Sequence, residues 1–214
     1  MEKFKKLSPH LVVILLFVGI SFTYFSPVLQ GELLNMADIT HHKGMSKELI
    51  DFREATGEEA LWTNSMFSGM PAYQISTRSN GNLIQYVAKT ISLGIPRPAN
   101  MLFLYLLGFY LLLLSLKVDY RLSAIGAIAF AFSSYFFIII MAGHMTKAHA
   151  IAYVPMVVAA VLYTYRGRML LGGVLTALAV ALELFANHLQ ITYYLLLMLI
   201  LIGLVQFIKD LKAN

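Results

Sequence analysis

Long apolar runs dominate the chain and predict helices that cross a membrane. Six segments are long enough to span a hydrocarbon core of about 30 Å, which takes roughly 20 residues at about 1.5 Å each. They lie at about Leu11–Leu29, Pro98–Leu116, Leu122–Ala142, Ala148–Tyr165, Met169–Ala186 and Leu189–Ile208. Each run must be helical, because backbone N–H and C=O groups have no water partner in lipid. The pattern therefore predicts an all-α membrane protein with about six transmembrane helices.

The first apolar run follows a basic start, as a secretory signal peptide also does. The basic residues are Lys3, Lys5 and Lys6. However, the apolar part is too long for a signal peptide, and no small-x-small cleavage site follows it. We therefore expect this run to remain in the protein as its first helix.

Basic residues between the runs predict the orientation, because short cytoplasmic loops are enriched in Lys and Arg. With six crossings, the basic residues outside the long loop all fall on one side of the membrane. They are Lys3, Lys5, Lys6, Lys117, Arg121, Arg166, Arg168, Lys209 and Lys212. We therefore expect a multi-pass protein with its N-terminus in the cytoplasm.

Residues 31–97 then form one large outer loop, between a first helix in residues 1–30 and five further helices in residues 98–214. We expect a single membrane domain. A connection of this length is usually functional or disordered, and its apolar content argues against disorder. Two short amphipathic helices are expected in it, the first ending at Thr56-Gly57 and the second near Pro96. Their apolar faces hold Met45, Leu49 and Phe52 in the first and Leu83, Val87 and Ile91 in the second.

The composition supports a membrane protein and excludes other classes. The chain of 214 residues is 59% hydrophobic and 13% charged, whereas soluble domains carry about 25% charged residues. The net charge of +5 does not indicate a nucleic-acid partner, because the basic residues form no continuous patch. The absence of cysteine excludes disulfides, thiolate zinc sites and a thiol nucleophile.

Polar residues gather on the predicted outer side, where they are candidates for a substrate pocket. They are Asp38, His41, His42, His144, Lys147, His149, Glu183, Asn187, His188 and Gln190. Glu183 lies about one turn inside the membrane and, at a spacing of four, shares a helix face with Asn187. A charge at mid-bilayer costs on the order of 3 kcal/mol. Glu183 therefore either fastens two helices by pairing with Lys147 or a histidine, or lines a pocket for a polar substrate.

The histidine spacing does not predict a metal site. His41 and His42 are adjacent, and His144 and His149 are five residues apart, which is not the i, i+4 spacing of a helical pair of ligands. We expect no metal and no cofactor, and a divalent cation has no support in the sequence. Neither a glycine-rich phosphate loop nor a serine elbow is present.

Several longer segments resemble the N-terminal part of the YfhO-type bacterial membrane proteins, and the resemblance covers nearly the whole chain. The segments are Ala37–Ile39, Gly44–Ser46, Thr56–Glu59, Trp62–Tyr73, Pro96–Pro98, Gly143-His144, Lys147–Ala150 and Ala186–Tyr194. These proteins look like glycosyltransferases of the GT-C class, which are polytopic and have a large first outer loop.

The resemblance implies an activity and a site. The donor would be a sugar on a polyprenyl phosphate, used on the outer side of the bacterial cytoplasmic membrane. The acceptor would be an envelope glycan or lipid. Asp38 matches the catalytic base that takes the proton of the acceptor hydroxyl. Lys147, His149 and Arg78 suit stabilisation of the departing lipid phosphate. Because family members are longer, we expect this sequence to be part of a longer chain and to be inactive alone.

Other interpretations stay open from the sequence. Asp38 can be a helix cap or a loop carboxylate. The protein can also be a non-catalytic scaffold that binds a glycosyltransferase, in which case Asp38 is freely replaceable. A transporter or flippase of lipid-linked sugars would place polar residues at mid-membrane in several helices, and the sequence has few.

Overall fold

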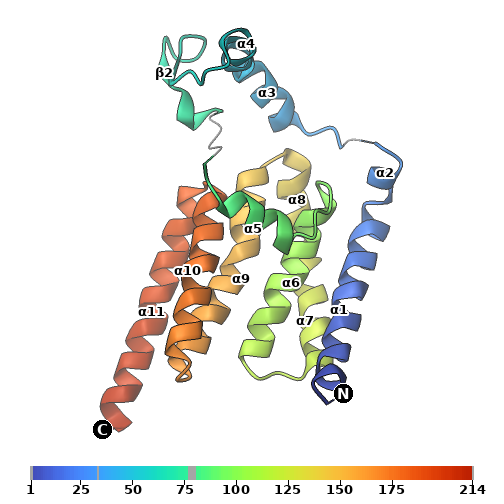
Figure 1. Ribbon diagram of the computed structural model, residues 1–214, viewed down its shortest axis with the longest axis vertical. Coiled ribbons are helices and arrows are strands. Elements are labelled where there is room, and N and C mark those ends of the chain that lie inside the picture. Colours follow the sequence, from blue (N-terminus) through green and yellow to red (C-terminus); the bar gives the residue numbers. More distant parts are fainter. Residues whose placement is uncertain (1, 33, 77–80, 214) are drawn as a thin grey trace.

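A bundle of long helices, with a small subdomain beyond one end, makes up the computed structural model of the protein (Figure 1). The structure describes residues 2–32, 34–76 and 81–213. The helices of the bundle are α1 (Glu2–Tyr24), α6 (Ala99–Ser115), α7 (Tyr120–Ala131), α8 (Ser134–Ala142), α9 (Met145–Tyr165), α10 (Met169–Phe185) and α11 (Leu189–Ala213). With α7 and α8 taken together as one bent segment, they run alternately in opposite directions along the chain (Figure 1).

The helices confirm a membrane protein at a coarser level than the sequence predicts. Among the described residues, α1, α9 and α11 are long and apolar enough to cross a membrane. The bent pair α7 and α8 makes a fourth span if it is counted as one. Helices α6 and α10 are apolar but have only 17 residues each. Six crossings therefore stay a prediction.

Two of the predicted runs are interrupted. The third run is broken between α7 and α8, which meet at 48° across Phe132-Ser133; paired serines, here Ser133 and Ser134, are a common site of helix kinks. The first run ends as α1 at Tyr24, and a short helix α2 (Ser26–Leu29) follows. Pro27 lies in its first turn, where a missing N–H costs nothing.

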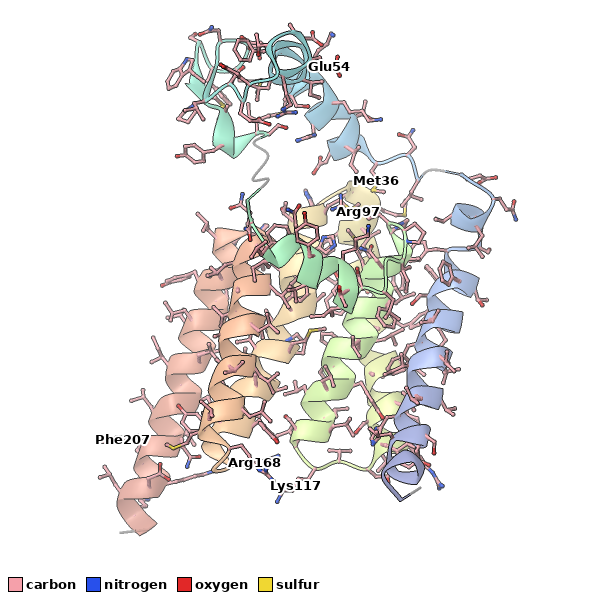
Figure 2. All side chains as sticks on the ribbon, viewed as in Figure 1. Met36, Glu54, Arg97, Lys117, Arg168 and Phe207 are labelled. Atoms are coloured by element: carbon pink, nitrogen blue, oxygen red, sulfur yellow. The ribbon has the colours of Figure 1, made fainter. Side chains whose placement is uncertain are left out.

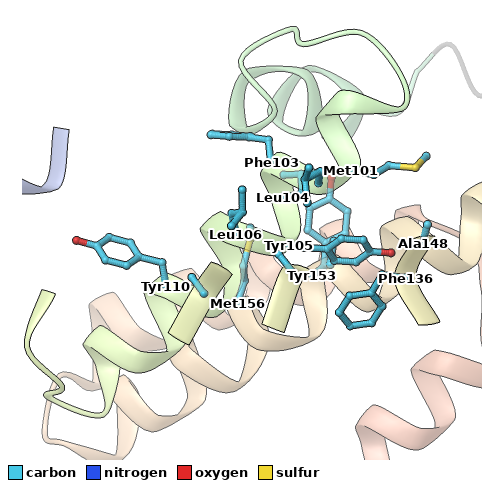
Figure 3. Packing of buried hydrophobic residues seen from close by; sticks show 14 of the residues in the cluster. Met101, Phe103, Leu104, Tyr105, Leu106, Tyr110, Phe136, Ala148, Tyr153 and Met156 are labelled. Atoms are coloured by element: carbon cyan, nitrogen blue, oxygen red, sulfur yellow. The ribbon is translucent and has the colours of Figure 1, made fainter. Parts of the chain in front are cut away.

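The buried core lies along α6 and α9, which pack against each other over their length. Figure 3 shows its aromatic part, where the rings of Tyr105 and Phe136 stack with centroids 4.4 Å apart. Gly108 lets the two helices approach closely, because a Cβ there would lie 2.7 Å from the carbonyl oxygen of Ala152. Small residues at helix interfaces are the usual means of close packing in membranes.

The long loop contains helices, as predicted, but in a different arrangement. Its elements are α3 (Ala37–Met45), α4 (Lys47–Thr56), β1 (Trp62–Thr63), β2 (Met70–Pro71), η1 (Ala72–Gln74) and α5 (Ile84–Ile91). The first expected amphipathic helix is α4, which ends as predicted where Gly57 turns left-handed with a φ of 75°. Leu49 is buried but Phe52 is exposed, so the predicted apolar face is only partly covered. Helix α5, the second, lies across the end of the bundle (Figure 1). Helix α3 contacts the bundle with its first turn, and α4 and the hairpin stand away from it (Figure 1).

The carboxylate of Glu48 holds the β1–β2 hairpin against α4. It accepts hydrogen bonds from the Thr63 hydroxyl and from the backbone N–H groups of Asn64 and Ser65. These donors, the Thr63 hydroxyl first, lower the pKa of Glu48 to about 2. The hairpin is thus fixed by a charged group that stays ionised far below neutral pH.

Candidate functional site

The polar residues of interest lie at one end of the bundle, which we call the loop end. Here α1, α8 and α10 end, and α6, α9 and α11 begin. Figure 2 shows Met36 and Arg97 at this end, and Lys117 and Arg168 at the opposite end. Lys117 and Arg168, two of the basic residues used to predict the orientation, therefore lie away from the loop (Figure 2).

Asp38 is in direct contact with the turn that precedes α9. It lies in the first turn of α3, and its Oδ2 is 2.7 Å from Nδ1 of His144. The glycine before that histidine makes the contact possible: Gly143 has a φ of 94°, and a Cβ there would lie 3.1 Å from the Cβ of Asp38 and 3.2 Å from that of Met36. Both side chains of the pair are about half exposed, at 45% for Asp38 and 49% for His144, so the carboxylate remains accessible.

A cavity of about 500 Å³ lies at this same end of the bundle, and we call it the loop-end cavity. Its walls are α5, residues 94–97, the starts of α6 and α9, and the end of α10. Met145 and Thr146, which directly follow His144, belong to its lining. The polar lining residues are Gln85, Lys89, Ser92, Arg97, Asn100, Thr146, His149, Tyr153 and Asn187. The chain segment that holds Asp38 in place thus also forms a wall of the cavity.

The charge in this lining is positive. Lys89 and Arg97 are exposed bases, and Arg97 is close enough to His149 to act on it electrostatically. The Nδ1 of His149 is 2.9 Å from the carbonyl oxygen of Met145. Nδ1 therefore donates to that oxygen, and Nε2 is left for a ligand. No acidic residue is among the described residues that line the cavity.

Asn100 adds a polar group that the protein itself leaves incomplete. Asn100 is 8% exposed, and its Oδ1 has no hydrogen-bond partner within the described part of the chain. Leaving such a buried group unpaired costs about 1–3 kcal/mol. A ligand or water molecule in the cavity would remove that cost.

An apolar groove of about 430 Å³ lies next to the cavity, between α6, α9 and α10. It starts at Ile91, adjacent to Ser92 of the cavity, and at Met156, about one turn along α9 from Tyr153. Further along it is lined by Leu111, Leu114, Ala159, Leu175, Leu178 and Leu182. This groove suits a hydrocarbon chain, while the cavity beside it suits a charged head.

The structure separates the predicted site residues into groups. His144 pairs with Asp38, while His149 and Asn187 line the loop-end cavity. Lys147 does not line it; its Nζ lies 5.5 Å above the centre of the Tyr135 ring. Two further predicted residues, Gln190 and His188, have other surroundings.

Gln190 is exposed and donates to the hydroxyl of Tyr194. His188 has a lowered pKa, because burial disfavours its charged form and the charges of Lys147 and His144 add to the effect. Its Nδ1 is buried with no partner in the described part of the protein. Arg78 lies outside the described residues.

Glu183 is fully buried, but its predicted partner is wrong. Both of its carboxylate oxygens lie 3.0 Å from the hydroxyl of Thr192 on α11, not beside Lys147 or a histidine. The predicted shared face with Asn187 is also wrong, because α10 ends at Phe185 and Asn187 turns left-handed with a φ of 56°. Glu183 thus joins α10 to α11, while Asn187 lines the cavity.

The other histidines of the loop form no centre with these residues. The Nε2 of His42 is 3.1 Å from the carbonyl oxygen of Ile75. Over the described ranges, no group of three or more His, Asp or Glu side chains is placed to hold a metal ion.

Lys89, Arg97 and Asn100 line the cavity but were not predicted from the sequence as site residues. Lys89 lies on the amphipathic helix α5, where a charge is most simply explained by solvent. Arg97 stands in the Pro96-Arg97-Pro98 segment of the resemblance, and an arginine between two prolines at the start of an apolar run was the available signal. Asn100 was hidden inside the second apolar run.

Comparisons with family models, with curated proteins and with solved structures gave no match.

Proposed function

We propose that the protein transfers a sugar from a polyprenyl-phosphate carrier on the outer side of the bacterial cytoplasmic membrane, as the resemblance to YfhO-type proteins of the GT-C class implies. One observation supports this most. The carboxylate of Asp38 is held on the turn before α9, and the first residues of α9 line a cavity with basic side chains. One short chain segment therefore connects the candidate base to the candidate anion site.

The topology of the proposal uses six crossings with the loop end outside. The alternating directions of α1, α6, α7–α8, α9, α10 and α11 support it (Figure 1). So does the placement of Lys117 and Arg168 away from the loop end (Figure 2), because short cytoplasmic loops are rich in such residues.

The lipid-phosphate donor would lie across the cavity and the groove. Its phosphate would bind to Lys89 and Arg97, with His149 and Asn100 as further polar contacts. A guanidinium suits phosphate because it can form two parallel hydrogen bonds with it. The prenyl chain would follow the apolar groove between α6 and α10.

The reaction needs one base and one stabilised leaving group. The pair with His144 involves Oδ2 of Asp38, and Oδ1 would accept the proton of the acceptor hydroxyl. The acceptor oxygen would form the new bond to the anomeric carbon. The bond between that carbon and the phosphate oxygen would break, and its electron pair would leave with the lipid phosphate. The basic side chains of the cavity would stabilise the charge that builds up there.

The experiment that tests the proposal replaces Asp38 by Asn, which keeps the shape and removes the base. Loss of a general base typically costs about 10²–10⁴-fold in rate. In native membranes that contain the protein at its natural length, we expect sugar transfer to fall by about that factor while donor binding is retained. Asp51→Asn is the control, because Asp51 pairs with exposed Lys47 four residues away, and such pairs contribute little. Full transfer by Asp38→Asn would contradict a catalytic role and favour a scaffold.

A further inference from the structure

A second cavity lies at the loop end of the bundle, and we call it the α1–α8 cavity. It has a volume of about 370 Å³ and is formed by the end of α1, α2, the residues after α2 and the end of α8. Its apolar wall consists of Tyr24, Phe25, Val28, Phe137, Ile140 and Met141. Nothing in the donor scheme above occupies it.

The two cavities share a boundary. Arg97 lines the loop-end cavity and the next residue, Pro98, lines the α1–α8 cavity. Met141 lines the second cavity, and Gly143, two residues further on, is in contact with Asp38. Asp38 therefore contacts a chain segment, residues 141–146, whose two ends line the two cavities.

The charge of the second cavity differs from that of the first. Glu32 is its one charged residue among the described residues that line it, and no Lys or Arg is among them. An anionic head group would meet a like charge here, whereas a neutral one would not. The carboxylate and the hydroxyl of Tyr24 can both accept hydrogen bonds from hydroxyl groups.

We propose that the α1–α8 cavity holds the acceptor, and that the acceptor is a neutral, hydroxyl-bearing membrane lipid. Its acyl chains lie against the end of α1 and α8, and its hydroxyl reaches Asp38. That hydroxyl gives its proton to Asp38, its oxygen bonds to the anomeric carbon, and the electron pair of the broken bond leaves with the lipid phosphate. The acceptor role rests on the proposed function, but occupancy of the cavity by such a lipid does not.

The test is photo-crosslinking in nanodiscs. A benzoylphenylalanine replaces Met141, which is 67% exposed and so tolerates the change. The control position is Tyr193, which is 57% exposed and lies one turn into α11 from the same end. The discs contain equal amounts of a glycosyl-diacylglycerol and phosphatidylglycerol. At position 141 we expect the neutral glycolipid to be labelled about fivefold more, equivalent to ~1 kcal/mol, and at position 193 we expect no preference.

Two further variants complete the test. Glu32→Gln should remove the preference at position 141, because the charge that disfavours the anionic lipid is gone. Met141→Trp should fill the cavity and lower transfer to the glycolipid while the binding of polyprenyl phosphate is unchanged. Equal labelling ratios at positions 141 and 193, or a preference for phosphatidylglycerol, would overturn the proposal. Because labelling requires no turnover, that result is distinguishable from failure of Asp38→Asn to reduce sugar transfer.

Discussion

The contact between α6 and α9 at Gly108 makes a quantitative prediction about both stability and the cavity. A methyl group at this position would lie 2.7 Å from the carbonyl oxygen of Ala152 and 3.5 Å from the side chain of Met156. The oxygen belongs to the backbone of a buried helix and cannot rotate away. Gly108→Ala must therefore push α6 and α9 apart.

Two opposing effects determine the size of the change. Overpacking a core typically costs about 1–3 kcal/mol, whereas replacing Gly by Ala inside a helix gains about 1 kcal/mol. The net loss for Gly108→Ala is then about 0–2 kcal/mol. Gly173 in α10 is the matched control, because a Cβ there meets nothing within 4 Å. Gly173→Ala should gain the helix stabilisation of about 1 kcal/mol without any overpacking cost. The free energies of unfolding of the two variants should therefore differ by about 1–3 kcal/mol.

The assay is unfolding in detergent micelles, followed by circular dichroism, with both variants compared with the unaltered protein. Gly108 lies one turn from Leu104, which lines the loop-end cavity together with Tyr153 of α9. Separation of the helices should therefore also weaken the binding of a lipid phosphate. If Gly108→Ala is as stable as Gly173→Ala, the close approach of α6 and α9 is refuted.

Three further predictions concern the loop, the helix contact at α11 and the topology. The hydrogen bonds to the Glu48 carboxylate stabilise the hairpin at pH values above the ordinary carboxyl pKa, and they are lost as the pH falls toward about 2. The fluorescence of Trp62, the one tryptophan, should change over that pH range, and this change should be absent in the Glu48→Gln variant. Thr192→Val removes the hydroxyl that contacts the buried carboxylate of α10 and should cost about 0.6 kcal/mol, the average for such bonds in membranes, with a loss above about 2 kcal/mol counting against a single bond. In a chain without cysteine, an impermeant thiol reagent on intact cells should label Glu54→Cys but not Asp210→Cys, and the reverse pattern would invert the topology.

Apolar periodicity and length predicted most of the bundle, because burial in lipid requires long continuous runs. The positions of the breaks were not predictable in the same way. The interruption between α7 and α8 follows from Ser133 and from packing, which no hydropathy window detects. The same holds for the end of α1 before Pro27.

The site was predictable only in part, because three-dimensional contacts decide which polar residues meet. The predicted topology placed Asp38 and His144 on the same side of the membrane, and the structure brings their side chains within 2.7 Å of each other. The sequence could not show that Lys147 lies beside Tyr135, because this contact depends on how the start of α9 packs against α8. Arg97 was missed because its contribution depends on how α5 and residues 94–97 fold over the start of α9.

The measurement that tests the central claim most directly is lipid binding by the purified protein, with polyprenyl phosphate compared with the same polyprenol lacking phosphate. Hydrogen bonds to charged groups contribute about 1.5–3 kcal/mol, so we expect the phosphate form to bind at least about tenfold more tightly. Arg97→Gln should remove most of that difference and leave the binding of the polyprenol unchanged. Equal affinity for the two lipids in the unaltered protein, or a phosphate preference that survives Arg97→Gln combined with Lys89→Gln, would contradict the assignment of the loop-end cavity as the donor site.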